Sequence, residues 1–179
     1  MREATRRRTT LATLRPARVG DVSGIRTIYN EAIRTTTATF DTKPRSRADQ
    51  LAWLQHHDTR HPVLVAEVGE TLAGWAALSP WSERQAYDGA AEISVYVVEK
   101  WRNRGVGRTL VTELLALAPR CGLHTVLARI AEGNPASRAL HLAVGFSSVG
   151  IMHEVGYKFD RFLDVELLEF RVLSASLPC

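Results

Sequence analysis

The chain is 179 residues long, with 45% hydrophobic and 23% charged residues and a net charge of +4. This length suffices for one well-buried core and is short for two. Because no apolar stretch is long enough to cross a bilayer and the two cysteines match no disulfide or metal spacing, we expect a reduced, cytoplasmic protein without a membrane or metal partner.

The first ten residues are basic and polar, and no apolar signal core follows them. We expect residues 1–10 to form a flexible tail and residues 11–179 to form a single domain. Much of the excess positive charge lies in this tail and around a glycine turn near residue 105. The basic residues are not interleaved with aromatic residues on one periodic face, which argues against a nucleic-acid partner.

The domain begins with a predicted edge strand and an amphipathic helix. Thr13–Arg18 favours an edge strand because Pro16 lacks a donor for the sheet ladder. Asp21 is a candidate N-cap for the following helix, which we expect to end at the β-branched run Thr35–Thr37. Apolar residues recur in it at helical spacing, namely Val22, Ile25, Ile28, Tyr29 and Ile33.

A second helix and a hairpin follow. Ser46 and Asp49 have the spacing of a capping box, which predicts a helix start. The apolar runs Pro62–Val68 and Leu72–Leu78 flank the short turn Gly69-Glu70, as in a β-hairpin.

The central segment predicts a strand, a glycine turn and a helix. A polar loop over Ser79–Ala90 leads to the strand Glu92–Val98, and apolar spacing indicates a helix over Arg108–Leu117. Gly105 and Gly107 lie between them, where the absence of a Cβ lets the backbone turn sharply and approach a ligand.

This glycine turn has the chemistry of a phosphate site. Amides at a helix start are free of intrahelical partners and lie at the positive end of the helix dipole. Arg102, Arg104 and Arg108 add positive charge at the same place. A Gly-x-Gly turn by itself also fits an ordinary strand-to-helix connection.

The last third of the chain predicts a strand, a helix and two long strands. Thr125–Ile130 is apolar, Asn134 can cap a helix whose first residue is proline, and Gly145 suits the end of that helix. Phe146–Val172 predicts two strands that fold back across Gly156. Helices interleaved with strands that are connected both by hairpins and by crossovers indicate a mixed α/β sheet.

Three motifs together resemble the GNAT acetyltransferase superfamily. They are Arg-x-x-Gly-x-Gly at Arg102–Gly107, Asn134-x-x-Ser137, and Leu140-His141-x-x-x-Gly145-Phe146. The resemblance runs from Leu14 to Val172 and is greatest to the phosphinothricin and methionine sulfone or sulfoximine N-acetyltransferases. The segments that carry it are Thr37–Phe40, Leu64–Val68, Pro80-Trp81, Ala86–Asp88, Ala91–Val97 and Gly105–Gly107.

The resemblance implies the GNAT fold, a twisted mixed sheet of about seven strands flanked by about four helices. It also implies acetyl-CoA as co-substrate, a homodimer and a role in antibiotic or herbicide resistance. The amide of Val97 is our candidate donor to the developing oxyanion. The residues expected to hold acetyl-CoA are Val95, Tyr96, Val97, Arg102, Asn103, Arg104, Gly105, Val106, Gly107, Arg108, Thr109, Asn134 and Ser137.

Two residues are candidates for proton transfer. Glu92 matches the catalytic glutamate of the family, and apolar neighbours in sequence would raise its pKa towards neutrality. It could act directly or through one water. Its ordinary alternative is a solvated carboxylate at a strand end. His141 lies where many GNAT enzymes have a tyrosine and could act as acid or base, or pack in its helix with a backbone carbonyl as partner.

The substrate pocket is expected from loops. By resemblance, Phe40 forms an aromatic wall, and Arg84 and Tyr87 hold the acidic end of an amino-acid substrate. Ser82 stands where the phosphinothricin enzymes have a basic residue, which favours a neutral sulfone or sulfoximine over a phosphinate. Solvation of Arg84 and ordinary packing of the two aromatic residues are the alternatives.

The leading hypothesis is direct acetyl transfer from acetyl-CoA to the α-amine of a small amino acid, with no acyl-enzyme. A phosphoryl-transfer enzyme would need Gly-Lys-Ser/Thr after the turn and carboxylates for magnesium, which the sequence lacks. A GNAT enzyme for a protein N-terminus or a polyamine, and a non-catalytic CoA-binding domain of the same fold, stay open.

Overall fold

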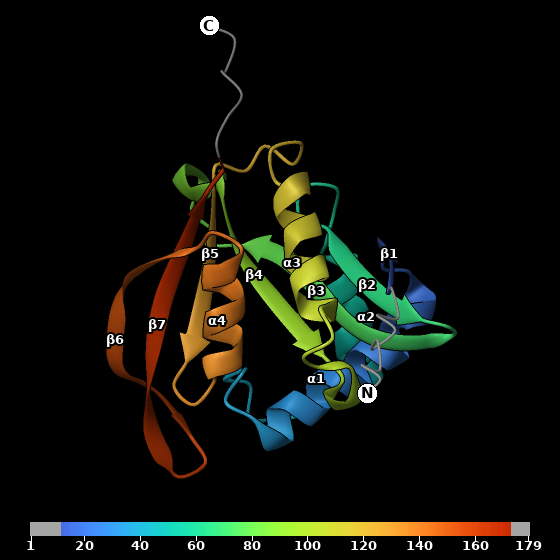
Figure 1. Ribbon diagram of the computed structural model, residues 1–179, viewed down its shortest axis with the longest axis horizontal. Coiled ribbons are helices and arrows are strands. Elements are labelled where there is room, and N and C mark those ends of the chain that lie inside the picture. Colours follow the sequence, from blue (N-terminus) through green and yellow to red (C-terminus); the bar gives the residue numbers. More distant parts are fainter. Residues whose placement is uncertain (1–11, 173–179) are drawn as a thin grey trace, which may run out of the picture.

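The computed structural model describes residues 12–172, so the predicted tail over residues 1–10 lies outside the described residues, as do residues 173–179. Strands and helices are interspersed along the chain (Figure 1). The strands are β1 (Thr13–Pro16), β2 (Val63–Val68), β3 (Thr71–Pro80), β4 (Ala90–Val97), β5 (Thr125–Ala131), β6 (Ser147–Lys158) and β7 (Arg161–Arg171). The helices are α1 (Val22–Thr35), α2 (Arg47–Gln55), α3 (Val106–Leu117) and α4 (Pro135–Ala143), with short 3-10 turns η1 (Val19–Asp21), η2 (Gln85–Tyr87) and η3 (Glu99–Trp101).

The seven strands form one sheet in the order β1-β2-β3-β4-β5-β7-β6. Every neighbouring pair is antiparallel except β4 and β5, which are parallel. The connection between these two strands passes through α3, as a parallel crossover requires. The mixed α/β class expected from the sequence is therefore confirmed. Between residues 12 and 172, no helix is both long and apolar enough to span a bilayer.

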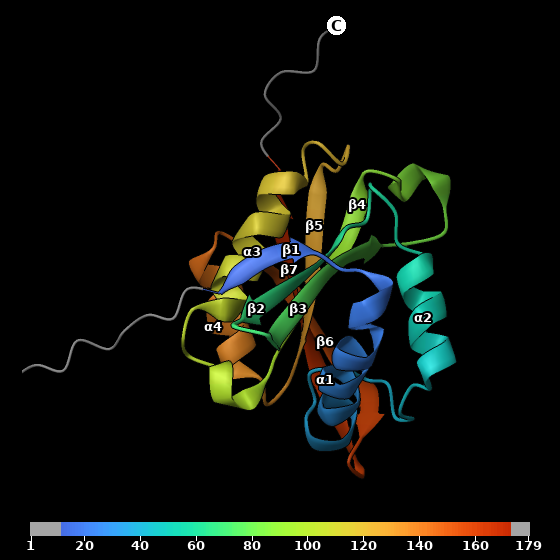
Figure 2. The ribbon, with the colours of Figure 1, turned by 90° about the vertical axis from the view of Figure 1, so that its right-hand side faces the viewer.

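Helices cover both faces of the sheet. In Figure 2, α1 and α2 lie on one side of the strands, and α3 and α4 lie on the other. On the α1 side, Ile25, Ile28 and Ile33 pack against the strands. On the α3 side, Leu110, Val111 and Leu114 are completely buried. Burial of these two apolar stripes fixes the sheet between its helices.

The predicted residues at the start of α2 and at both ends of α4 were confirmed. The Ser46 hydroxyl accepts a hydrogen bond from the Asp49 amide at 3.1 Å, and α2 begins at the next residue. The Asn134 side chain accepts one from the Ser137 amide at 3.3 Å, with the following proline at the first position of α4. Gly145 has a φ of 103°, so it ends α4 as predicted.

The prediction that Asp21 caps α1 was confirmed for its position, which is the N-cap, but was wrong for its side chain. Asp21 has helical backbone angles within the turn η1, and its side chain makes no capping bond. Its carboxylate instead accepts two bonds from the Arg15 guanidinium, at 2.7 and 2.8 Å, and one from the Arg18 amide at 2.7 Å. These charge-assisted partners outcompete the helix amides for one carboxylate.

The prediction that the last two strands turn at Gly156 was also wrong. The turn is formed by Phe159 and Asp160, both with positive φ, between β6 and β7. Gly156 lies inside β6, where an added Cβ would come within 1.9 Å of the Phe40 ring. The glycine is therefore needed for the close approach of Phe40 to the strand and not for a turn.

The parallel pairing of β4 and β5 is short. It runs from Ala90 and Thr125 to Glu92 and Leu127 and then stops. On its other edge, β4 remains paired with β3 as far as Val97. Beyond Glu92 the two parallel strands diverge (Figure 1), which leaves one edge of β4 without a neighbouring strand.

Candidate active site

The open edge of β4 presents backbone groups at alternate residues. The amide of Val98 donates to the Ala73 carbonyl of β3 at 2.9 Å. Because successive amides of a strand point to opposite edges, the amides of Tyr96 and Ser94 also face β3, and those of Val97 and Val95 face the gap. The Val97 carbonyl accepts a bond from Arg102 Nε at 3.1 Å. This stretch can therefore pair with an extended ligand.

Two cavities meet at this gap. The first, of about 560 Å³, extends over β4 towards α1 and the loop after it. The second, of about 540 Å³, extends towards the start of α3. Six residues line both cavities, namely Thr37, Ala38, Val95, Tyr96, Asn134 and Ser137. A long ligand lying along β4 would thus reach from one cavity into the other.

The glycine turn opens α3 as predicted. Gly105 has a φ of 87° and directly precedes the helix, so the amides of its first turn have no intrahelical carbonyl. Arg102 and Asn103 line the second cavity beside these amides. Arg104 instead stacks on Trp101, with its guanidinium carbon 5.2 Å from the ring centre. The arrangement suits an anionic group such as a diphosphate.

Gly107 also lines the second cavity, but packing accounts for its lack of a side chain. An added Cβ would lie 2.9 Å from Leu140 Cδ1 and 3.4 Å from Val97 Cγ2. Gly107 therefore lets α3 approach α4 and β4 closely. Of the residues expected to hold acetyl-CoA, eight line the second cavity: Val95, Tyr96, Val97, Arg102, Asn103, Gly107, Asn134 and Ser137. The other five expected residues line neither cavity within residues 12–172, namely Arg104, Gly105, Val106, Arg108 and Thr109.

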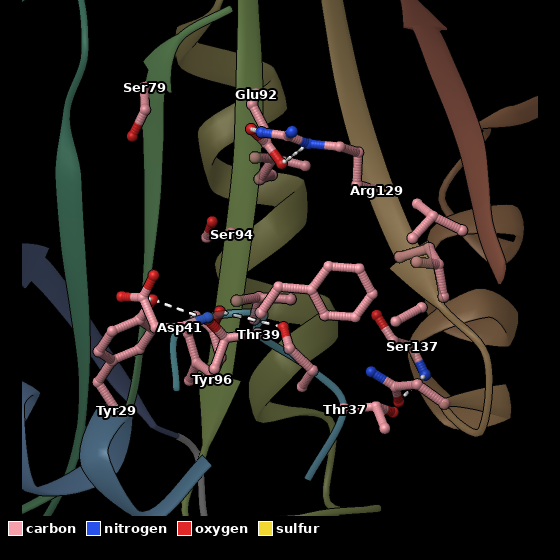
Figure 3. Close-up of a pocket in the computed structure, with 18 of the residues that line it drawn as sticks. Tyr29, Thr37, Thr39, Asp41, Ser79, Glu92, Ser94, Tyr96, Arg129 and Ser137 are labelled. Atoms are coloured by element: carbon pink, nitrogen blue, oxygen red, sulfur yellow. Dashed lines mark hydrogen bonds and ion pairs between the residues drawn. The ribbon is translucent and has the colours of Figure 1, made fainter. Parts of the chain in front are cut away.

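Glu92 lines the first cavity at the last paired position of β4. Its carboxylate accepts two bonds from Arg129 of β5, one of them from Nε at 2.8 Å (Figure 3). The Glu92 side chain is 20% exposed and that of Arg129 is 52% exposed. The Arg129 guanidinium also lies over Trp81, 5.3 Å from the ring centre. Glu92 is therefore not a solvated carboxylate at a strand end. The group that contacts its carboxylate is the Arg129 cation, whereas the sequence suggested apolar neighbours.

His141 lines the first cavity and is buried, with 2% of its surface exposed. Its Nδ1 lies 2.8 Å from the Ser137 carbonyl, so this nitrogen carries the proton and donates. Its Nε2 is buried and has no hydrogen-bond partner in the described chain. Burial lowers the pKa of the imidazole, which keeps it neutral and leaves Nε2 as an acceptor.

The three residues expected to bind substrate lie in different places. Phe40 lines the first cavity and packs over the backbone of β6. Arg84 and Tyr87 belong to the exposed loop around η2 and line neither cavity within residues 12–172. Within one chain, Phe40 therefore lines the same cavity as Glu92, whereas Arg84 and Tyr87 do not.

A polar cluster missed from the sequence forms the wall of the first cavity near α1. The Tyr29 hydroxyl contacts Thr39 Oγ1 and Asp41 Oδ2, both at 2.8 Å (Figure 3). Arg45 Nη2 lies 3.1 Å from the same Asp41 oxygen. Burial raises the pKa of Tyr29 to about 12, so it stays a neutral hydroxyl. These residues come from a helix and a loop whose meeting no local pattern indicates.

Arg129 was missed as well, although a signal for it exists. It is the one charged residue within the apolar run Thr125–Ala131 of β5. A charge inside such a strand is uncommon unless it is paired or functional. Its partner is set by the parallel register of β4 and β5.

The described cysteine is not placed as a nucleophile. Cys121 is buried, its thiol donates to the Thr59 carbonyl at 3.3 Å, and it lines neither cavity. Burial raises the pKa of this thiol, which disfavours the reactive thiolate. The geometry therefore offers no acyl-enzyme at Cys121.

Known proteins share this sequence and architecture. The sequence model of the acetyltransferase (GNAT) family matches residues 25–146. An L-methionine sulfoximine/L-methionine sulfone acetyltransferase of Pseudomonas aeruginosa is 39% identical over 90% of this chain and 95% of the relative. A phosphinothricin N-acetyltransferase of Streptomyces viridochromogenes is 37% identical over 85% and 83%. The solved structure of a GNAT superfamily phosphinothricin acetyltransferase from Sinorhizobium meliloti in complex with acetyl-CoA has a TM-score of 0.86 and 31% identity, covering 89% of this chain and 88% of that one.

The burial of His141 predicts a pH dependence of stability. The unfolded chain takes up a proton on this imidazole near pH 6.5, whereas burial disfavours that proton in the folded state. The free energy of unfolding should therefore be highest above about pH 6.5 and fall as the pH drops below it. Denaturant titrations from pH 7.5 to pH 5 should give a smaller fall for His141→Gln than for the unchanged protein.

His57 is a half-buried histidine whose pKa is also lowered by burial, so part of the pH dependence should persist in the His141→Gln variant. His124→Gln, at an exposed position, serves as the control and should retain the whole dependence. Nitrogen NMR of the unchanged protein should show a neutral His141 with its proton on Nδ1 at pH 7. A His141 imidazolium at that pH would contradict the assignment.

Proposed function

Since this chain belongs to the GNAT acetyltransferase family, we propose that it transfers the acetyl group of acetyl-CoA to the α-amine of a small amino acid. The observation that carries the proposal is the meeting of two cavities at the open edge of β4, with Glu92 in one and the start of α3 beside the other. One cavity suits the amino acid and the other suits CoA.

The residues around the second cavity fit the chemistry of CoA. Free amides at the start of α3, with Arg102 and Asn103 beside them, suit its diphosphate. The alternating backbone groups of Val95 and Val97 suit the amides of its pantetheine arm. Bound acetyl-CoA supplies the acetyl group as a thioester. The Val97 amide then serves as the donor to the oxygen on which charge develops.

Glu92 acts as the base that takes a proton from the substrate ammonium, directly or through one water. The nitrogen then bonds to the acetyl carbon while the carbon–sulfur bond breaks. Two protons leave the nitrogen in all, of which one ends on the CoA sulfur and one in the solvent. His141, neutral and with Nε2 as its free atom, acts as a hydrogen-bond acceptor in the cavity and not as the acid.

The substrate class is proposed from the relatives, whose names give methionine sulfoximine, methionine sulfone and phosphinothricin. Phe40 provides an aromatic wall for an aliphatic chain. Contacts of Arg84 and Tyr87 with the substrate stay predictions from the family resemblance. We include in the proposal a cytoplasmic location and a role in resistance to such compounds.

We also propose a homodimer that forms through the edge of the sheet at β6. This strand is exposed along most of its length and is the last strand of the sheet. Apolar side chains stand out from the β6–β7 hairpin, namely Val149, Ile151, Val155, Tyr157, Phe159 and Phe162. An exposed apolar edge strand is a ready site for association. Val155 and Met152 also line the first cavity, so a second copy would lie close to the substrate.

A substrate panel tests the proposed activity. Purified enzyme with acetyl-CoA should acetylate L-methionine sulfone, L-methionine sulfoximine or phosphinothricin, and should leave a polyamine and a peptide N-terminus without measurable turnover. Release of the CoA thiol gives the rate. Rapid acetylation of the polyamine alone would contradict the substrate class.

The same assay tests Glu92. Glu92→Gln should lower kcat by about 10²-fold or more because the amide cannot accept the proton. The affinity for acetyl-CoA, measured by calorimetric titration, should stay within about twofold of the unchanged enzyme because Glu92 lies outside the second cavity. Normal turnover by this variant would show that another group is the base.

Charges on the exposed hairpin should separate the proposed dimer. Val155→Glu combined with Tyr157→Glu places two like charges on side chains that are 55% and 56% exposed. Sedimentation velocity should give a dimer for the unchanged protein and a monomer for the double variant. Val19→Glu, at an equally exposed apolar position on η1, is the matched control and should remain dimeric. A monomeric unchanged protein at micromolar concentration would contradict the proposal.

A further inference from the structure

Two opposite charges stand side by side at the top of the first cavity. Glu92 ends the paired part of β4, and Arg129 reaches it from β5 with two parallel hydrogen bonds. Both side chains line the cavity and both retain contact with solvent. The pair is therefore accessible to a ligand (Figure 3).

The substrate class of the proposed function has the complementary charges. An α-amino acid carries an ammonium and a carboxylate on one carbon atom. When the ammonium meets Glu92, the group nearest to Arg129 is the carboxylate on that same carbon. The guanidinium can hold it with the same two-pronged geometry that it uses with Glu92.

We propose that Arg129 is the specificity-determining residue that binds the α-carboxylate of the substrate, exchanging Glu92 for it as the substrate enters. This inference rests on the proposed acetylation of amino acids. The exchange keeps every charge paired, since Glu92 gains the ammonium as Arg129 gains the carboxylate. Glu92 is thereby released to act as the base only when a carboxylate is present.

Arg129 is held in place for this exchange by more than Glu92. Its guanidinium lies over the Trp81 ring, a contact that persists when the carboxylate partner changes. Its backbone is fixed in β5 by pairing with Leu167 of β7. The cation therefore stays beside Glu92, while the longer side chain of the substrate extends along the cavity towards Tyr29 (Figure 3).

An amine without a carboxylate has no group to replace Glu92 as the partner of Arg129. To reach Glu92 it must separate the Glu92–Arg129 pair and leave the guanidinium without a partner. Removal of one member of a partly desolvated pair is costly. The site should thus reject polyamines and carboxamides by charge as well as by shape.

The test compares L-methionine sulfone with its α-carboxamide in kcat/KM. The unchanged enzyme should prefer the free acid by about 10²-fold. Arg129→Gln should raise KM for the acid, leave the carboxamide nearly unchanged and bring the ratio to within about fivefold. Arg129→Lys, which keeps the charge but loses the fork, should give an intermediate ratio.

Arg138→Gln is the matched control, because Arg138 makes a similar two-pronged pair with Glu166, at 2.6 and 3.2 Å, outside both cavities. It should keep the ratio of the unchanged enzyme. CoA binding and the melting temperature of each variant report that it is folded.

Three outcomes would overturn the inference. Equal rates of the unchanged enzyme on acid and carboxamide would do so while preserving acetyl transfer to amines. An equal loss of kcat on both substrates in Arg129→Gln, with the ratio intact, would show that Arg129 only positions Glu92. A folded, CoA-binding enzyme that acetylates neither substrate would overturn the proposed function and this inference together.

Discussion

The separation of β4 from β5 beyond Glu92 is the constraint on which the rest of the structure depends. Two parallel strands that pair over only three residues leave backbone amides of β4 without a strand to accept them. Unpaired backbone groups in a sheet interior are costly unless a ligand or water takes the place of the strand. The gap is sustained because β4 is held on its other edge by β3, and β5 by β7. The same gap joins the two cavities and sets Glu92 at its closed end.

The two cavities that meet at the gap carry different charges. The amides at the start of α3 and the side chain of Arg102 make the second cavity positive, whereas the first cavity carries a balanced pair of charges. A balanced pair suits a zwitterion because neither of its charges is buried alone on binding. His141 adds a neutral acceptor, since its other nitrogen is engaged by the Ser137 carbonyl. The two ends are thus suited to ligands of different charge.

Sequence patterns predicted the features that depend on residues close together in the chain. They missed the contacts between residues far apart in the chain. The capping box at Ser46, the glycine turn at Gly105 and the order of strands and helices depend on local chemistry, and the structure confirmed them. Asp21 stands at the N-cap position of α1, but its side chain makes no cap because Arg15 takes its carboxylate. Gly156 lies within β6 because the chain turns later, at Phe159 and Asp160. Its missing side chain makes room for Phe40, which is far away in sequence. The partner of Glu92 follows from the parallel register, which no pattern along the chain specifies.

Amide exchange along β4 tests the central role of its open edge most directly. In nitrogen-15-labelled protein, the amides of Val95 and Val97 should exchange quickly without ligand and become protected when CoA is added. Tyr96, whose amide faces β3, should exchange slowly in both states and serves as the internal reference. Bound CoA that leaves Val95 and Val97 unprotected would contradict the account, because the ligand would then lie elsewhere.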